Sequence, residues 1–294
     1  MRDSRGRHLL PRRSVLAAGL TGAAALGLGL GGQVGSAPRE TAVPLANQPN
    51  VSVERLYSRA RNRSVNFVLM FPEGVPRRDL PVCLMLHGRF GDARKSAAGL
   101  PDWLSQSVAA GRIPPFAFLA VDGGGNNYWH RRPNDDPLWM LLGEVPRWLA
   151  ERNLGGRRHR PFAAAGISMG GFGALLYARR RREMGHPLTA AAVVSPALIT
   201  SWPEMRKRKA FANEAEWAAI DPLRHIKALG DLPLGVWCGT EDRFIEGTRR
   251  FIRLADPEYA STTPGGHNSR YYRKALPELV DFIGTQLAES GEHR

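Results

Sequence analysis

The stretch Phe162-Ala163-Ala164-Ala165-Gly166-Ile167-Ser168-Met169-Gly170-Gly171-Phe172-Gly173 decides the fold of this chain. It begins as a short apolar run, typical of a strand buried on both faces, and continues as a helix-like run. The pattern G-x-S-x-G lies between them, and it lifts a serine above the sheet in a turn that needs very small residues on either side. We therefore predict that Ser168 is a nucleophile and that Gly166 and Gly170 make room for the turn. The alternative is a glycine-rich turn without chemistry.

Strand-like and helix-like runs alternate on both sides of this stretch, which predicts a doubly wound α/β domain. The expected strands are Val51–Tyr57, Val65–Phe71, Val82–His87, Phe116–Asp122, Phe162–Ile167, Ala191–Ser195, Leu234–Cys238 and Glu258–Thr262. The first two alternate in polarity and are predicted to form an antiparallel edge pair. The expected helices are Arg94–Ala110, Leu138–Arg152, Met169–Met184, Ile245–Leu254 and a last one from Tyr272 to Leu287, with a kink at Pro277. Residues 196–232 contain no expected strand and are interpreted as a cap-like insertion.

Two later loops offer partners for the serine, which is a weak nucleophile unless a base takes its proton. Asp242 follows an apolar strand, and His267 lies in a glycine turn before the last helix. Serine, acid and histidine in this order match hydrolases in which each member follows a strand. We predict His267 as the base and Asp242 as the acid, with Glu241 and Glu246 as alternatives. The competing interpretation is that these are surface side chains.

An oxyanion hole needs two backbone N–H groups near the serine. Met169 supplies the first, because it follows the nucleophile at a helix N-terminus. The second is expected in the loop after an earlier strand, where His87-Gly88-Arg89 follows an apolar run. We assign it to Arg89, because glycine before it lets the backbone approach the substrate. His87 and Gly88 would otherwise be ordinary turn residues.

The motifs together resemble one known family. They are His87-Gly88, Asp122-Gly123-Gly124, Gly166-Ile167-Ser168-Met169-Gly170-Gly171, Cys238-Gly239-Thr240-Glu241-Asp242 and Gly265-Gly266-His267. This set, spread from about Val51 to Leu287, is similar to the bacterial putative-esterase family, which includes S-formylglutathione hydrolases, feruloyl esterases and mycolyltransferases. The resemblance implies an α/β-hydrolase fold, with a mostly parallel sheet of about eight strands and helices on both faces. It also implies that Ser168, Asp242 and His267 form a catalytic triad, with Arg89 and Met169 as oxyanion donors.

Two further segments resemble parts of this family. Mycolyltransferases place a glutamate acid at a helix start that Ile245-Glu246-Gly247 resembles, which keeps Glu246 open as the acid. Tyr128-Trp129-His130 with Asp135-Asp136 resembles an esterase segment at the mouth of the site. The alternative for that segment is a structural loop.

Three hypotheses for function follow. The first is a serine esterase that hydrolyses carboxylic esters through an acyl-serine intermediate. The second is an acyltransferase of mycolyltransferase type that uses a sugar or glycerol hydroxyl. The third is a non-catalytic cell-wall interaction protein, which an intact triad argues against. No cofactor or metal is expected, because the sequence has neither a P-loop nor a cluster of histidines and cysteines with ligand spacing.

The N-terminus predicts export. Residues 1–37 combine basic residues, the pair Arg12-Arg13 and an uncharged, glycine-rich apolar run from Val15 to Leu30. This arrangement is typical of a twin-arginine signal peptide, whose partner is the twin-arginine export machinery. The run is shorter than the ~20 residues of a membrane span. We expect a linker at 38–50, a hydrolase domain at 51–290, and a mature protein that is secreted or cell-wall associated with no stable membrane span.

Composition sets the remaining limits. The 294 residues carry a net charge of +14, and only five of the 41 basic residues are lysine. We interpret the arginines as a solvated surface, or one attracted to anionic cell-wall polymers. Nucleic-acid binding is not expected, because no nucleic-acid-binding motif is present and the arginines are scattered. Cys83 and Cys238 lie on strands expected three places apart, about 14 Å, so we predict two free thiols.

Overall fold

The computed structural model describes residues 48–291. The predicted signal at 1–37 and most of the predicted linker at 38–50 lie outside the described residues. One mixed sheet of eight strands forms the centre, in the order β1-β2-β4-β3-β5-β6-β7-β8. Its strands are β1 (Val51–Ser58), β2 (Arg63–Met70), β3 (Val82–Leu86), β4 (Ala117–Val121), β5 (Ala163–Ile167), β6 (Ala190–Val194), β7 (Leu234–Gly239) and β8 (Tyr259–Thr263). β1 and β2 pair antiparallel at one edge of the sheet, and the six strands β4, β3, β5, β6, β7 and β8 are parallel to one another. This arrangement confirms the predicted fold class.

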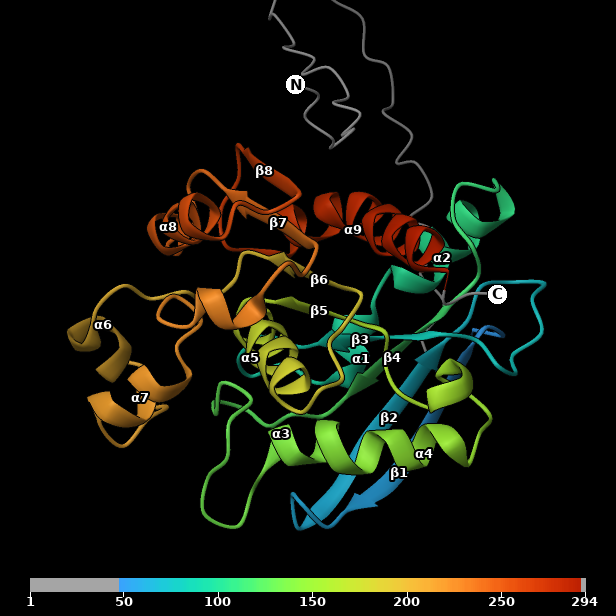
Figure 1. Ribbon diagram of the computed structural model, residues 1–294, viewed down its shortest axis with the longest axis horizontal. Coiled ribbons are helices and arrows are strands. Elements are labelled where there is room, and N and C mark those ends of the chain that lie inside the picture. The colour runs from blue at the N-terminus through green and yellow to red at the C-terminus, as the bar shows by residue number, and fades with distance from the viewer. Residues whose placement is uncertain (1–47, 292–294) are drawn as a thin grey trace, which may run out of the picture. The chain divides into compact units, whose positions relative to one another are not determined.

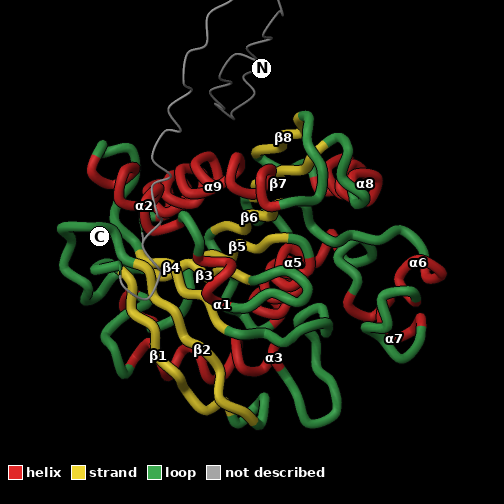
Figure 2. Tube along the Cα trace, turned by 180° about the vertical axis from the view of Figure 1, so that it is seen from behind, coloured by secondary structure: helices red, strands yellow, loops and turns green. Residues whose placement is uncertain are grey.

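The core lies on both faces of this sheet, because side chains alternate along each buried strand. Along β3, Leu84 and Leu86 join one apolar cluster, whereas Cys83 and Met85 join the other. The first face is covered by α3 (Pro137–Trp139), η2 (Met140–Glu144), α4 (Val145–Ala150), α5 (Met169–Glu183) and α8 (Ile245–Ala255). The second face is covered by α1 (Ala93–Ala97), α2 (Leu100–Ala109) and α9 (Ser269–Ser290). Figure 1 shows the helices on both sides of the sheet, and Figure 2 shows the strands from behind.

Two predicted helices differ from the structure. The expected helix Arg94–Ala110 is divided into α1 and α2 at Gly99, which has φ 83°. Pro101 explains the break, because proline lacks an N–H and is tolerated in the first turn of a helix but not in its interior. The last helix runs through Pro277 as one element, α9.

The expected helix Leu138–Arg152 contains a π-helical turn, η2, between α3 and α4. Pro146 follows this turn and cannot donate the next helical hydrogen bond, which accounts for the local widening. The turn carries buried Glu144, whose carboxylate accepts hydrogen bonds from the N–H groups of Arg59 (2.8 Å) and Ala60 (3.1 Å). Glu144 therefore anchors the hairpin between β1 and β2.

Residues 196–232 contain α6 (Trp202–Arg206), α7 (Glu214–Ile220) and η4 (Ile226–Leu229), and no strand. Two hydrogen bonds join this segment to the loop after β4. The Asn126 side-chain amide donates to the carbonyl of Arg208 at 2.7 Å, and the His130 ring lies 3.1 Å from the carbonyl of Ala210. The segment is thus fixed beside the carboxyl ends of the strands.

The two cysteines are far apart in the sheet. Cys83 is on β3 and Cys238 on β7, three strand positions away, and both are buried free thiols. The prediction of unpaired cysteines is confirmed. Within residues 48–291, no helix is both long and apolar enough to cross a membrane.

Candidate active site

The turn between β5 and α5 holds Ser168 in a backbone conformation that L-residues rarely adopt, with φ 58° and ψ −117°. Its flanking glycines are required by close packing. A methyl group on Gly166 would overlap the carbonyl of Gly170, and one on Gly170 would overlap the carbonyl of Leu86 on β3. The turn is therefore wedged against the neighbouring strand, and Ser168 begins α5 at the carboxyl edge of the sheet.

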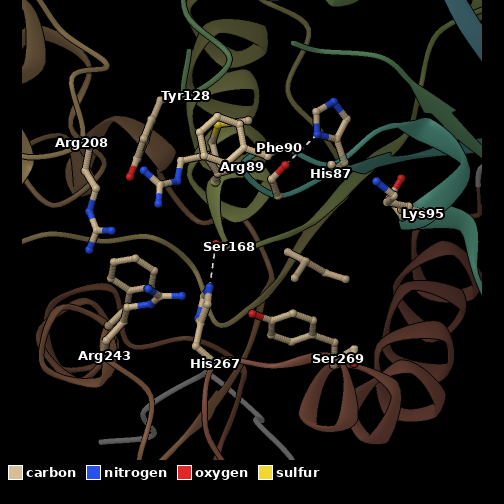
Figure 3. Close-up of a pocket in the computed structure, with 17 residues that line it drawn as sticks. His87, Arg89, Phe90, Lys95, Tyr128, Ser168, Arg208, Arg243, His267 and Ser269 are labelled. Carbon is tan, nitrogen blue, oxygen red and sulfur yellow. Dashed lines mark hydrogen bonds between the residues drawn. The ribbon is translucent and has the colours of Figure 1, made fainter. Parts of the chain in front are cut away.

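The structure brings Ser168, His267 and Asp242 together from three loops, after β5, β8 and β7. Ser168 Oγ lies 2.9 Å from His267 Nε2, and His267 Nδ1 lies 2.8 Å from Asp242 Oδ2. Figure 3 shows the imidazole pointing at the serine hydroxyl. Since an ionised carboxylate only accepts, His267 Nδ1 carries the proton and Nε2 is free to accept from Ser168. This is the arrangement that a serine nucleophile and its general base require.

Asp242 is 2% exposed and stays ionised. Burial is the largest influence on its pKa and acts to raise it, but hydrogen bonds from His267 and from the Phe244 N–H (2.9 Å) outweigh burial and hold the pKa below its usual value. A buried carboxylate that remains charged can orient the imidazole and balance its positive charge after proton transfer.

The two alternative acids lie elsewhere. Glu246 begins α8 with 77% of its side chain exposed and forms an ion pair with Arg249 at 3.3 Å. Glu241 is exposed. Neither carboxylate contacts His267, so the geometry favours Asp242, and the feature that resembled a mycolyltransferase acid does not reach the base.

Arg89 and Met169 both line the cavity beside Ser168. Across the described residues, neither backbone N–H donates to a protein acceptor. Their loops are in close contact, because a methyl on Gly88 would lie 3.3 Å from Ser168 Cβ. Both N–H groups therefore remain available for an oxyanion, which is the role predicted for them.

His87 has a role that the sequence did not reveal. This buried imidazole donates from Nδ1 to the carbonyl of Gly88 at 2.8 Å and accepts at Nε2 from the N–H of Gly123 at 2.8 Å. The Gly88–Arg89 peptide is trans and planar, so its carbonyl and the Arg89 N–H point in opposite directions. The Gly91 N–H also donates to this carbonyl, at 3.0 Å, so His87 and Gly91 together fix the direction of the Arg89 N–H.

Of the segment predicted at the site mouth, only Tyr128 lines the cavity. Trp129 is fully buried and donates from Nε1 to the carbonyl of His87 at 3.2 Å, and His130 stacks on Phe211 with ring centroids 4.6 Å apart. Asp135 forms an ion pair with buried Arg61 at 2.7 Å. Asp136 caps α3. Most of this segment is therefore the structural loop of the alternative interpretation.

A cavity of about 370 Å³ opens above Ser168. Its lining adds Arg208 from the 196–232 segment and Arg243 and Phe244 from the loop after β7. Sequence reasoning missed these side chains, because no motif marks them and only the fold brings them to Ser168. Within residues 48–291, no group of three or more metal-ligating side chains comes together.

A family model described as "Putative esterase" matches residues 58–283. The chain belongs to this esterase family. No curated protein matches the esterase in sequence. Its fold is similar to a ferulic acid esterase (TM-score 0.67, 21% identity, covering 80% of this chain and 98% of that one). It is also similar to an S-formylglutathione hydrolase from Staphylococcus aureus (TM-score 0.62, 17% identity, 79% and 98% covered). A thermostable carboxylesterase from a metagenomic library shares the fold at TM-score 0.60 (15% identity, 81% and 90% covered).

Proposed function

We propose that this member of the esterase family hydrolyses carboxylic esters through an acyl-serine intermediate. One observation carries the proposal: an unbroken line of hydrogen bonds joins Ser168 Oγ, His267 and Asp242 at the floor of a cavity. The nucleophile, the base and the group that orients the base are thus in contact before substrate binds.

The reaction begins when Ser168 Oγ attacks the ester carbonyl carbon and His267 Nε2 takes its proton. The carbonyl oxygen becomes an oxyanion, which the N–H groups of Arg89 and Met169 stabilise, each such donor contributing roughly 3–4 kcal/mol. The tetrahedral intermediate then expels the alcohol, which receives the proton from His267, and leaves the acyl group on Ser168. Water attacks this ester with His267 again as base, releasing the acid and restoring the serine.

Labelling with a fluorophosphonate tests this mechanism. We expect one adduct on the folded protein, at Ser168, together with turnover of p-nitrophenyl acetate. Ser168→Ala should lose both, whereas Ser269→Ala, which removes another hydroxyl lining the cavity, should retain both. An adduct at another residue, or no adduct on folded protein, contradicts the mechanism.

We also propose that the esterase is exported through the twin-arginine route and works in the cell envelope or outside the cell. The support is the pair Arg12-Arg13 before an uncharged, glycine-rich apolar run. Arg12→Lys with Arg13→Lys should leave the precursor in the cytoplasm, whereas Arg5→Lys with Arg7→Lys, which lies outside the pair, should not. Undiminished secretion of the first variant contradicts the twin-arginine route.

A further inference from the structure

Three arginines line the cavity from three separate segments. Arg89 follows β3, Arg208 belongs to the 196–232 segment, and Arg243 follows β7. Figure 3 shows the three side chains on one side of Ser168, whereas Lys95 lies on the other side. The sequence separates them widely, so their convergence results from the fold.

These arginines have no acidic partner. Some buried or half-buried arginines elsewhere in residues 48–291 pair with carboxylates, as Arg61 does with Asp135 (2.7 Å) and Arg152 with Glu54 (2.6 Å). Buried Arg181 instead donates to two backbone carbonyls and the Tyr177 hydroxyl. No aspartate or glutamate lines the described cavity, and none of its three arginines forms an ion pair with a described residue. The remaining cation of the cavity, Lys95, forms an ion pair with Asp92 and lies on the opposite side of Ser168. The arginine side of the cavity is therefore a concentration of uncompensated positive charge.

Arg208 gives a second, independent indication of a missing partner. Its Nε is buried and has no hydrogen-bond partner. A buried guanidinium N–H without an acceptor costs free energy, because a charged donor loses its water and gains nothing in return. Because the side chain lines the cavity, a turn that exposes this nitrogen would let a ligand oxygen accept from it.

Aromatic rings pack against all three guanidinium groups. Arg208 and Arg243 both lie over Phe244, with Cζ 5.4 and 5.6 Å from the ring centroid, and Arg89 lies over Phe90 at 4.9 Å. All three charges also act on the Tyr128 hydroxyl. Burial is the main influence there and raises the pKa of Tyr128, while each of the three arginines acts to lower it. The phenol thus lies among the three charges.

We propose that the ester substrate carries an anionic group, a carboxylate or a phosphate, which Arg89, Arg208 and Arg243 bind beside Ser168. This inference rests on the proposed esterase function and specifies its substrate class. Guanidinium groups present several N–H donors in one plane, which match the paired oxygens of carboxylate and phosphate. In a partly closed cavity such contacts are stronger than on an open surface, because less water screens them.

Matched ester pairs test the proposal and locate the anion. p-Nitrophenyl hydrogen glutarate against p-nitrophenyl pentanoate places a carboxylate on the acyl side. 4-Acetoxybenzoate against 4-acetoxybenzamide places it on the alcohol side, and 4-acetoxyphenyl phosphate against 4-methylphenyl acetate replaces it by phosphate. We expect at least one anionic ester to exceed its neutral partner in kcat/KM by about tenfold or more, as expected for a hydrogen bond to a charged group. The preference should fall in about 0.5 M sodium chloride, which screens the charges.

Variants assign any preference to the arginines. Arg208→Gln and Arg243→Gln should each reduce the anionic-to-neutral ratio several-fold, and the double variant should bring it close to one. Arg208→Lys keeps the charge but removes the planar donors, so it should lower the ratio less than Arg208→Gln. Arg55→Gln removes the same charge from an exposed position on edge strand β1 and should leave the ratio unchanged.

The outcomes separate this inference from the proposed function. Equal or lower kcat/KM for every anionic ester overturns the inference, as does a preference that the arginine variants do not change. If fluorophosphonate still labels Ser168 and the neutral esters are still hydrolysed, the proposed function stands in that case. Absence of both labelling and turnover of every ester overturns the esterase function itself.

Discussion

Two histidines face the same cavity, and their ring nitrogens bind different kinds of group. His87 holds two backbone groups, the carbonyl of Gly88 and the N–H of Gly123. His267 holds two side chains that take part in proton transfer, the Asp242 carboxylate and the Ser168 hydroxyl. Both rings follow a strand at the carboxyl edge of the sheet, so their location alone does not distinguish them.

The difference shows that the partners of a histidine decide its role. A carbonyl can only accept and a peptide N–H can only donate, so His87 is fixed in one neutral tautomer with no nitrogen left for a substrate proton. Burial, the main influence, lowers its pKa and keeps it neutral. His267 faces a carboxylate that can only accept a hydrogen bond and a hydroxyl that can supply a proton. One histidine therefore positions the candidate oxyanion loop, and the other is the candidate base.

Removing the candidate base should give the largest effect. We expect His267→Ala to lower kcat by about 10⁶-fold, because serine hydrolases lose nearly all triad catalysis when the base is absent. The melting temperature should change little, since the ring is at the cavity wall. Initial rates with p-nitrophenyl acetate and thermal melts measure the two quantities, and retention of more than a small fraction of activity would remove His267 from the mechanism.

Removing the charge behind that base should give the next effect. Asp242→Asn preserves the shape but no longer fixes the productive tautomer of His267, so kcat should fall by ~10⁴-fold. Glu246→Gln and Glu241→Gln are matched controls and should change kcat little, because an exposed ion pair such as Glu246 with Arg249 contributes only about 0–1 kcal/mol. A crippled Glu246→Gln beside an active Asp242→Asn would reverse the assignment and favour an acyltransferase of mycolyltransferase type.

Removing the positioning histidine should give a smaller loss of a different kind. His87→Ala removes one of the two hydrogen bonds to the Gly88 carbonyl and leaves the one from the Gly91 N–H. The Arg89 N–H is then held less firmly, so kcat should fall by up to about 10²–10³-fold, the usual effect of losing one oxyanion donor completely. Fluorophosphonate should still label Ser168, although more slowly. The control is His225→Ala, whose ring also contacts a backbone carbonyl, that of Ala218 at 2.9 Å, but does not line the cavity. Equal kcat in both variants would show that His87 does not position the donor.

The smallest expected effect concerns stability and pH. Because His87 has a lowered pKa, its unfolded form takes up a proton below about pH 6.5 that the folded form does not, so acid favours unfolding. The stability that His87 adds over His87→Ala should therefore be complete above pH 6.5 and smaller at pH 5.5, by at most about 1.4 kcal/mol. Urea unfolding of both proteins at pH 7.5 and 5.5 measures this difference. A difference that grows in acid would mean that the folded ring is protonated.

The fold was predictable from the sequence because buried strands leave a local signal. Each predicted strand overlaps an observed one. The inner strands are short apolar runs between turns, which are visible without knowledge of their neighbours, whereas β1 and β8 are partly exposed edge strands. Two helix interruptions were not predicted, one at Gly99 and one at the π-helical turn before Pro146. In both places a single helix was expected to continue across a glycine or a proline.

The residues of the candidate site also fall into two groups, those that the sequence identified and those that only the structure revealed. Ser168, Asp242 and His267 could be named from a motif and from their order after strands, and the structure brings them together. Arg208, Arg243 and the bonds of His87 could not, because each depends on contacts between segments distant in sequence. Contacts of that kind leave no local pattern.

The tight packing of the serine turn separates two kinds of information in G-x-S-x-G. Gly166 and Gly170 are required by backbone atoms of Gly170 and Leu86, whether or not any ester is bound. Ser168 is required only for chemistry. Selection for folding alone would therefore retain both glycines but would not retain the serine side chain at position 168. In a descendant of this chain that had become a pure binding protein, both glycines would remain, and within the motif only the residue at position 168 would record the lost activity.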